Sequence, residues 1–134
     1  LPAPGIVAPQ ANDLVWQVWS DDASAVARAK GKLVFVDVTA DWCITCKANK
    51  ALVLETAPIA PMLAALVDDG KLVMLKADWT RPDPRSAAVL ASHDRIGIPF
   101  NIIYGPKVPE GVLLGELLRA DMVENALIKA GMVR

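Results

Sequence analysis

The sequence has few of the residues that hold metal ions or staple small domains. Its 134 residues include one histidine, His93, and two cysteines, Cys43 and Cys46. A zinc site with four cysteine and histidine ligands cannot be built from three such residues, and two cysteines cannot form the several bridges of a small disulfide-rich secreted domain. Any role of the cysteines must therefore come from the pair itself.

The chain also lacks a strong charge and a long apolar run. Its 14 basic and 15 acidic side chains leave a net charge of −1, so we expect no nucleic-acid partner and no polybasic membrane patch. No apolar run approaches the roughly 18–20 residues that span a bilayer, and no signal-peptide pattern is present. Because 54% of the residues are hydrophobic, the chain can bury a core, and we expect a soluble globular domain.

Residues 1–12 contain proline and glycine without periodicity, which predicts a linker followed by one domain over residues 13–134. Beyond the linker, strand and helix patterns alternate. The order β-α-β-α-β-α-β-β-α predicts an α/β fold whose mixed sheet is flanked by helices on both faces. The expected strands are 15–19, 33–39, 72–77, 101–104 and 112–114, and the expected helices are 21–29, 43–54, 62–70, 84–93 and 121–131.

Local signals refine these elements. The nearly all-apolar run 33–39 is typical of a central strand covered on both faces. Loop 105–111 is too short for a crossover helix, so the last two strands should be antiparallel. Three further details are expected: a helix cap at Ser20 or Asp21, a helical face burying Ile44, Ala48 and Leu52, and a capping box of Asp121 and Glu124.

Cys43 and Cys46 form a C-x-x-C motif that follows the predicted central strand and opens a helix. At that position the first sulfur lies beside unpaired backbone N–H groups and the positive end of the helix dipole. The pKa of the Cys43 thiol should therefore fall, while Cys46 should face the core and keep a higher pKa. This asymmetry predicts thiol–disulfide exchange, in which Cys43 attacks a disulfide and Cys46 resolves the mixed disulfide.

Two other interpretations of the pair stay open. A purely structural disulfide would stabilise little, because so short a loop hardly restrains the unfolded chain. A carrier of Cu(I), for which thiolates are good ligands, would instead predict a βαββαβ order and cysteines in an exposed loop.

The motif and its surroundings resemble a known family. Residues 36–43 resemble the active-site entry of the thioredoxin fold, and Ile98-Pro99 matches its cis-proline position. Residues 39–47 (TADWCITCK), 77–80 (ADWT) and 97–100 (GIPF) are similar to the C-terminal periplasmic domain of the DsbD/ScsB thiol:disulfide interchange family. The resemblance runs from about residue 33 to the C-terminus, and residues 97–106 lean towards ScsB. The Ile44-Thr45 centre differs from the Gly-Pro of thioredoxin itself.

The resemblance implies a thioredoxin-like fold and a protein-disulfide reductase without cofactor or metal. By analogy, a membrane-embedded domain of the same protein would supply electrons. The acceptor would be a periplasmic thioredoxin-like protein or the N-terminal domain of the same protein. The chain would then be a periplasmic domain of an inner-membrane protein. The alternatives are a stand-alone periplasmic thioredoxin-like reductase or an oxidase, since the sequence does not set the reduction potential.

Asp37 is the expected proton partner of Cys46. An aspartate in so apolar a strand should be desolvated, which raises its pKa and allows proton exchange with the buried thiol. The alternative is an aspartate that faces solvent at a sheet edge. Lys50 stands where DsbD has a second acid, and Lys76 could pair with Asp37 or be solvated.

The remaining candidates surround the motif. Trp42, Ile98 and Pro99 are expected to form the substrate-docking edge, with a cis peptide before Pro99. An alternative for Trp42 is simple packing. Trp79 and Phe100 are expected to pack in the core, and His93 to end a helix without a catalytic role.

Overall fold

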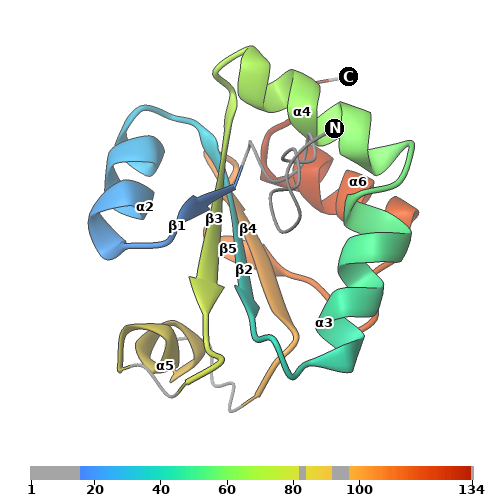
Figure 1. Ribbon diagram of the computed structural model, residues 1–134. Helices are drawn as coiled ribbons and strands as arrows, with labels where there is room; N and C mark the ends of the chain where they lie inside the picture. The colour runs from blue at the N-terminus through green and yellow to red at the C-terminus, as the bar shows by residue number, and fades with distance from the viewer. Residues whose placement is uncertain (1–15, 82–83, 92–96, 134) are drawn as a thin grey trace, which may run out of the picture.

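The computed structural model describes residues 16–81, 84–91 and 97–133 and contains a five-stranded mixed sheet (Figure 1). The strands lie in the order β1-β3-β2-β4-β5. The first three in that order run parallel, whereas β4 is antiparallel to both β2 and β5. The mixed sheet is as predicted, and the predicted linker lies outside the described residues. The strands are β1 (Trp16–Val18), β2 (Leu33–Thr39), β3 (Leu72–Asp78), β4 (Phe100–Gly105) and β5 (Val108–Leu113).

Helices cover both faces of this sheet, and Figure 1 separates the two groups. On one side lie α2 (Asp21–Ala29) and α5 (Pro84–Ala91). On the other side lie α3 (Ile44–Asn49), its π-helical continuation η1 (Lys50–Leu54), α4 (Ile59–Asp68) and α6 (Ala120–Ala130). The order of elements is not the βαββαβ order that Cu(I) carriage would predict.

Within the described residues, no single helix has both the length and the apolar composition of a membrane span. Only the helical segments Ile44–Leu54 and Ile59–Asp68, bent by 78° at their junction, reach that length and composition when counted together.

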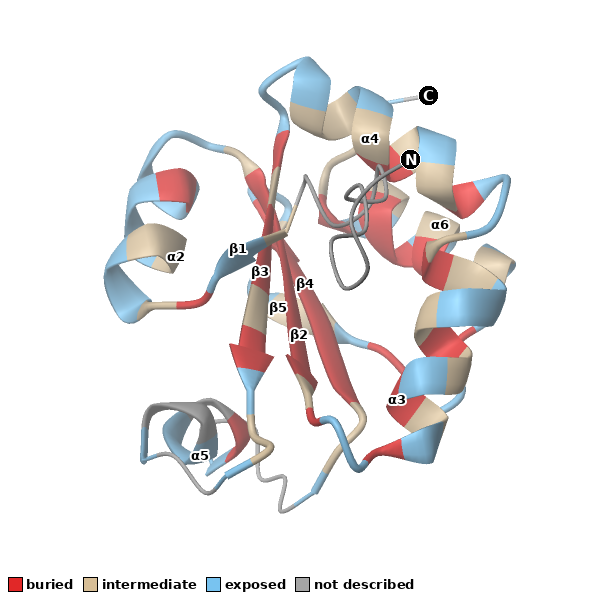
Figure 2. Ribbon diagram, viewed as in Figure 1, coloured by how far each residue is buried: buried red, intermediate tan, exposed pale blue. Residues whose placement is uncertain are grey.

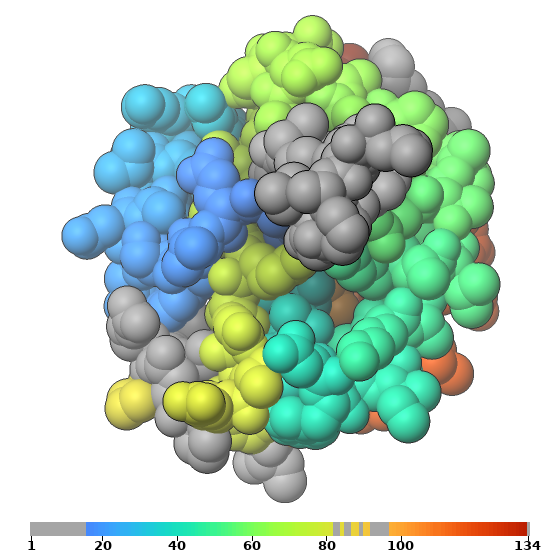
Figure 3. All heavy atoms as spheres, in the orientation of Figure 1, coloured from blue at the N-terminus to red at the C-terminus, as the bar shows by residue number. Residues whose placement is uncertain are grey.

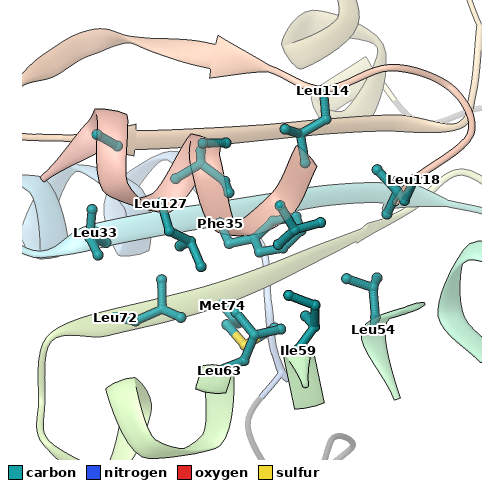
Figure 4. Close-up of a cluster of buried hydrophobic side chains, with 14 residues drawn as sticks. Leu33, Phe35, Leu54, Ile59, Leu63, Leu72, Met74, Leu114, Leu118 and Leu127 are labelled. Atoms are coloured by element: carbon teal, nitrogen blue, oxygen red, sulfur yellow. The ribbon is translucent and has the colours of Figure 1, made fainter. Parts of the chain in front are cut away.

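The core consists of two apolar layers that meet at β2, which is buried from Leu33 to Val38 (Figure 2). Side chains alternate between the faces of a strand. Leu33 and Phe35 therefore join the layer beneath α4 and α6 (Figure 4), while Val34 and Val36 join the layer beneath α2 and α5. A strand covered on both faces must be apolar throughout, which is why residues 33–36 and Val38 lack the usual polar alternation.

The predicted helix start near residue 21 is confirmed. Ser20 has extended backbone angles and its hydroxyl accepts a hydrogen bond from the Ala23 N–H at 3.0 Å. The predicted capping box near residue 121 is wrong. Helix α6 begins at Ala120 after an Arg119 cap that makes no side-chain capping bond, and Arg119 pairs with Asp121 instead.

The hairpin of β4 and β5 is tighter than expected. Strand β5 begins at Val108 and not at residue 112, so the predicted loop 105–111 shrinks to a turn at Pro106 and Lys107. The early part of β5 contains Pro109 and Gly111, which are tolerated because β5 is an edge strand. Its pairing with β4 has an irregular register between Ile103 and Gly105.

The predicted buried face of the helix after Cys43 is also wrong. Ile44 and Leu52 are 83% and 73% exposed, and Ala48 is only half-buried. The inward face instead carries Cys46 and Asn49, followed by Leu54 after the π-helical turn. The helix takes this orientation because Asn49 is hydrogen-bonded to the chain at residues 116 and 118 while Cys46 packs beside Ala40.

Candidate active site

The two cysteines lie where β2 ends and α3 begins. Cys43 is the N-cap of α3, with extended backbone angles of φ −88° and ψ 100°. The Cys46 N–H donates a hydrogen bond to the Cys43 sulfur at 3.1 Å, and the two sulfurs form a disulfide. The first sulfur therefore occupies the position that caps the helix, where negative charge is favoured. The sequence predicted a helix from residue 43, one residue before the observed start of α3 at Ile44.

Both cysteines are buried in this oxidised form, Cys43 at 6% and Cys46 at 7% exposure. They pack with Ala40 and with the half-buried Ile98. The expectation that Cys46 faces the core is confirmed. The two cysteines are buried to the same extent, so burial does not explain a difference in reactivity between their sulfurs. Their positions differ, because Cys43 caps α3 whereas Cys46 lies in its first turn.

Asp37 lies on the central strand β2 and is buried. Burial raises the pKa of its carboxyl group to about 7, against the opposing influence of the positive charges of Lys76 and then Lys50. The predicted desolvation is thus confirmed, and the alternative of a solvent-facing aspartate is wrong. A carboxyl group with such a pKa exchanges its proton near neutral pH, which suits proton transfer.

A pocket of about 190 Å³ connects Cys46 with the lysines that act on Asp37. Lys76 is half-buried on β3, in register with Asp37, and its ammonium group lies 5.4 Å from the centre of the Trp16 ring. Lys76 therefore lies inside the sheet and not at a solvated edge, because β1 covers that side of β3. The pocket is lined by Thr39, Ala40, Asp41, Cys46, Lys47, Lys50, Lys76 and Asp78.

The loop after β3 supports the loop that carries Cys43, and the two segments lie side by side in Figure 3. The Asp41 N–H donates to the Thr80 hydroxyl at 2.9 Å, and the Trp42 indole N–H donates to the Thr80 carbonyl at 3.1 Å. The Thr80 hydroxyl and N–H both donate to Asp78, and these bonds hold the pKa of the Asp78 carboxyl group below its ordinary value.

Of the expected docking residues, Trp42 directly precedes Cys43 and Ile98 packs against the cysteines. Trp42 is 59% exposed, and its ring centre lies 6.5 Å from that of Trp79, so it both packs and remains accessible. The Ile98–Pro99 peptide bond is cis, as expected from the sequence, and both residues are half-buried just before β4.

The packing residues also lie as expected. Phe100 is buried and Trp79 packs against the same core layer. His93 lies outside the described residues. Among residues 16–81, 84–91 and 97–133, no cluster of three or more histidine, cysteine or acidic side chains could hold a metal ion.

Sequence reasoning missed two buried asparagines. Asn49 donates from its amide nitrogen to the Glu116 carbonyl at 2.8 Å and accepts from the Leu118 N–H at 3.0 Å. Asn101 is the register partner of Asp37 on β4, is 2% exposed, and its Oδ1 is buried without a hydrogen-bond partner. A polar residue inside the apolar run from Phe100 to Tyr104 was the available signal for Asn101.

Comparisons with known proteins agree with this geometry. Residues 15–106 match the model of a family described as thioredoxin-like. The chain is 33% identical over 94 residues to the thiol:disulfide interchange protein DsbD of Cronobacter sakazakii, covering 68% of this chain and 15% of that protein. It is 30% identical over 105 residues to DsbD of Yersinia enterocolitica, covering 76% of this chain and 17% of that protein. The chain thus spans about a sixth of the length of these relatives.

Solved structures show the same fold. The oxidised C-terminal domain of Neisseria meningitidis DsbD superposes with a TM-score of 0.60 at 24% identity, over 85% of this chain and 99% of that one. A thioredoxin from Thermus thermophilus superposes with a TM-score of 0.61 at 20% identity, over 87% of this chain and 88% of that one. The predicted thioredoxin-like α/β fold is confirmed, and so is the resemblance to the C-terminal domain of DsbD.

Proposed function

The chain belongs to the thioredoxin-like family, and on that premise we propose that it is a thiol–disulfide oxidoreductase domain that reduces protein disulfides. The observation that carries the proposal is the Cys43 sulfur at the start of α3, bonded to Cys46 and accepting the Cys46 N–H. A thiolate at that position is stabilised by the helix terminus and is a good nucleophile.

The reaction starts from the dithiol form. The Cys43 thiolate attacks one sulfur of a target disulfide, and the other target sulfur leaves with the electron pair and takes up a proton. Cys46 then gives its proton to Asp37 and attacks the Cys43 sulfur, forming the Cys43–Cys46 disulfide and releasing the second target thiolate. Two electrons pass from the domain to the target, and the domain is oxidised.

The source of those electrons is the second part of the proposal. We assign residues 13–134 to a domain of a longer, DsbD-like protein, with residues 1–12 as its linker. A membrane-embedded domain of that protein would reduce the Cys43–Cys46 disulfide, and a periplasmic thioredoxin-like or N-terminal-domain disulfide would accept the electrons. The support is the similarity to proteins of the DsbD type, of which this chain matches about a sixth. The leaning of residues 97–106 towards ScsB remains a prediction.

The docking surface follows from the same site. Trp42 and Ile44 flank Cys43 in the chain and are 59% and 83% exposed, so they offer apolar contacts to a partner. Ile98 packs against the sulfur pair, and with the adjoining Pro99 it would present a backbone edge to an extended segment of the target.

Replacement of the resolving cysteine tests the proposal. In a Cys46→Ser variant the attack by Cys43 still occurs, but the mixed disulfide cannot be resolved. We expect a partner to remain covalently attached on a non-reducing gel and to be released by dithiothreitol. The matched control Cys43→Ser should trap nothing. Equal trapping by the two variants, or trapping by neither, would refute the assignment.

The direction of electron flow needs a separate measurement. Equilibration with glutathione or dithiothreitol buffers gives the reduction potential of the Cys43–Cys46 pair. A reductase should equilibrate near the potential of thioredoxin, roughly −270 mV, whereas an oxidase should lie nearer −120 mV. Retention of Cu(I) by the wild type without any trapped species would favour the carrier hypothesis instead.

A further inference from the structure

Three polar side chains form a row across the centre of the sheet. Lys76 on β3, Asp37 on β2 and Asn101 on β4 are register partners. Register partners project from the same face of a sheet, with Cβ atoms about 4.5–5.5 Å apart in an antiparallel pair. Their face is the one that Phe35 and Ile103 share with α4 and α6. Asp37 therefore has a lysine on one side and an asparagine on the other.

The side-chain carbonyl oxygen of Asn101 lacks a hydrogen-bond donor. The side chain is 2% exposed, and its Oδ1 is a buried acceptor without a partner. Leaving a buried acceptor unpaired is costly, so native proteins nearly always supply a donor. An ionised carboxylate offers only acceptors, whereas a protonated carboxyl group offers one O–H donor. Asp37 can therefore satisfy Asn101 only in its protonated form.

We propose that Asn101 is a positioning residue for the proton on Asp37: its Oδ1 accepts a hydrogen bond from the protonated carboxyl group when the cysteines are oxidised. The part of this inference that concerns proton transfer from Cys46 rests on the proposed function. When Cys46 attacks, its S–H bond breaks and the Asp37 O–H bond forms, directed at Asn101. The Cys46 sulfur keeps the electron pair and bonds to Cys43, and the target sulfur leaves as a thiolate.

The groups around Asp37 have opposing influences. Lys76 from β3 and Lys50 from η1 both favour the ionised carboxylate. Cys46, which comes from α3, is uncharged while it is in the disulfide. Burial favours the neutral acid, and Asn101 from β4 adds a hydrogen bond that exists only in that protonated form. Asn101 thus acts against the two lysines.

The Asn101→Leu variant tests the assignment, because leucine fills the same space without an acceptor. Titration of the Asp37 carboxyl carbon by NMR in the oxidised protein gives the pKa directly. We expect the variant to titrate about half to one pH unit lower than the wild type, the size of one net hydrogen bond. An unchanged midpoint would overturn the proposal, and so would a higher one, which would mean that the amide N–H donates to the carboxylate. Asn125→Ala is the control, since its side chain is exposed on α6, and it should leave the midpoint unchanged.

A second variant keeps the test valid if the leucine variant does not fold. Asn101→Asp puts another carboxyl group beside Asp37, and two close carboxyl groups titrate as a coupled pair. We expect two steps, the upper one at least one unit above the wild-type midpoint. Two independent titrations, with Asp37 at its wild-type midpoint, would show that position 101 does not contact Asp37 and would overturn the inference.

Activity measured in parallel separates this inference from the proposed function. If the wild-type chain fails to reduce a protein disulfide, the proposed function fails whatever Asp37 does. If the wild type is active and Asn101→Leu titrates like it, only the role of Asn101 fails. If the wild type is active and the Asp37 midpoint shifts in Asn101→Leu, the pH dependence of mixed-disulfide resolution should shift as well. The pH at which the variant reaches half its maximal rate of resolution should then be lower than in the wild type, like the Asp37 midpoint.

Discussion

Asp37 and Lys76 lie side by side on the parallel strands β2 and β3, yet the carboxyl group of Asp37 has a raised pKa of about 7. A neighbouring ammonium group ordinarily favours the carboxylate. Here the desolvation of a side chain buried in the sheet outweighs the attraction of Lys76 and of Lys50. The pKa of Asp37, the proposed proton acceptor for Cys46, thus lies near neutrality because of opposing effects, and each can be tested.

Asp37→Asn should stabilise the oxidised protein at pH 8 and have little effect at pH 4. Between its ordinary pKa of 3.8 and the folded value of about 7, Asp37 holds a proton in the folded state that the unfolded chain has lost. The stability it contributes is therefore complete below pH 4 and is lost as the pH rises to about 7. The neutral variant avoids that loss, which amounts to at most about 4 kcal/mol. Urea unfolding at the two pH values measures the difference.

The control for this experiment is Asp78→Asn on the neighbouring strand. Its carboxyl group is exposed, and hydrogen bonds from Thr80 lower its pKa, so its contribution has the opposite sign and disappears as the pH falls. A gain for Asp37→Asn of equal size at pH 4 and pH 8 would contradict the raised pKa.

In the reduced protein, iodoacetamide should alkylate Cys43 at least about tenfold faster than Cys46 at pH 7. The Cys43 sulfur caps α3, where a thiolate is stabilised, whereas Cys46 lies inside the first turn. Mass spectrometry of samples quenched over time gives the two rates. Cys46→Ala and Cys43→Ala provide each rate in isolation, and equal rates would mean that the helix terminus does not activate Cys43.

Thr80→Val should loosen the loop that carries Cys43. The variant loses the hydroxyl that accepts from the Asp41 N–H and donates to Asp78. We expect a loss of about 1 kcal/mol in stability and a rise in the pKa of Asp78 towards its ordinary value. Thermal unfolding and NMR titration check the two effects. Thr80→Ser keeps the hydroxyl and should behave like the wild type; if it resembles Thr80→Val, the methyl group and not the hydroxyl is responsible.

Asn49→Ala should destabilise the protein by about 2–3 kcal/mol, because the Leu118 N–H and the Glu116 carbonyl both lose their partner in a part-buried region. The exposed Asn125 on α6 is the matched control, and Asn125→Ala should change stability by less than about 0.5 kcal/mol. Chemical unfolding of both variants measures the difference. Similar small losses in the two would show that Asn49 does not fix α3 to the chain that precedes α6.

Much of the fold could be predicted from the sequence because its signals are local. The apolar run of β2, the Ser20 cap and the prolines near α4 and α5 act within a few residues of one another. Strand β5 was only partly recognised, because Pro109 and Gly111 are typical of a loop and yet are tolerated in an edge strand. The expected burial of Ile44 and Leu52 was wrong for a related reason: a helix shows which residues share a face, but what that face meets depends on distant chain.

At the site, the chemistry proposed for the sulfur pair follows from local sequence alone. Cys43 and Cys46 are three residues apart at the end of an apolar strand, and the backbone geometry of a helix start then places one sulfur at the cap. The surroundings of Asp37, in contrast, depend on the three-dimensional fold. Lys76 lies 39 positions further along the chain than Asp37, and Asn101 lies 64 positions further. They become its neighbours only through strand pairing, because which strands pair, and in which register, depends on how segments far apart in the chain pack together.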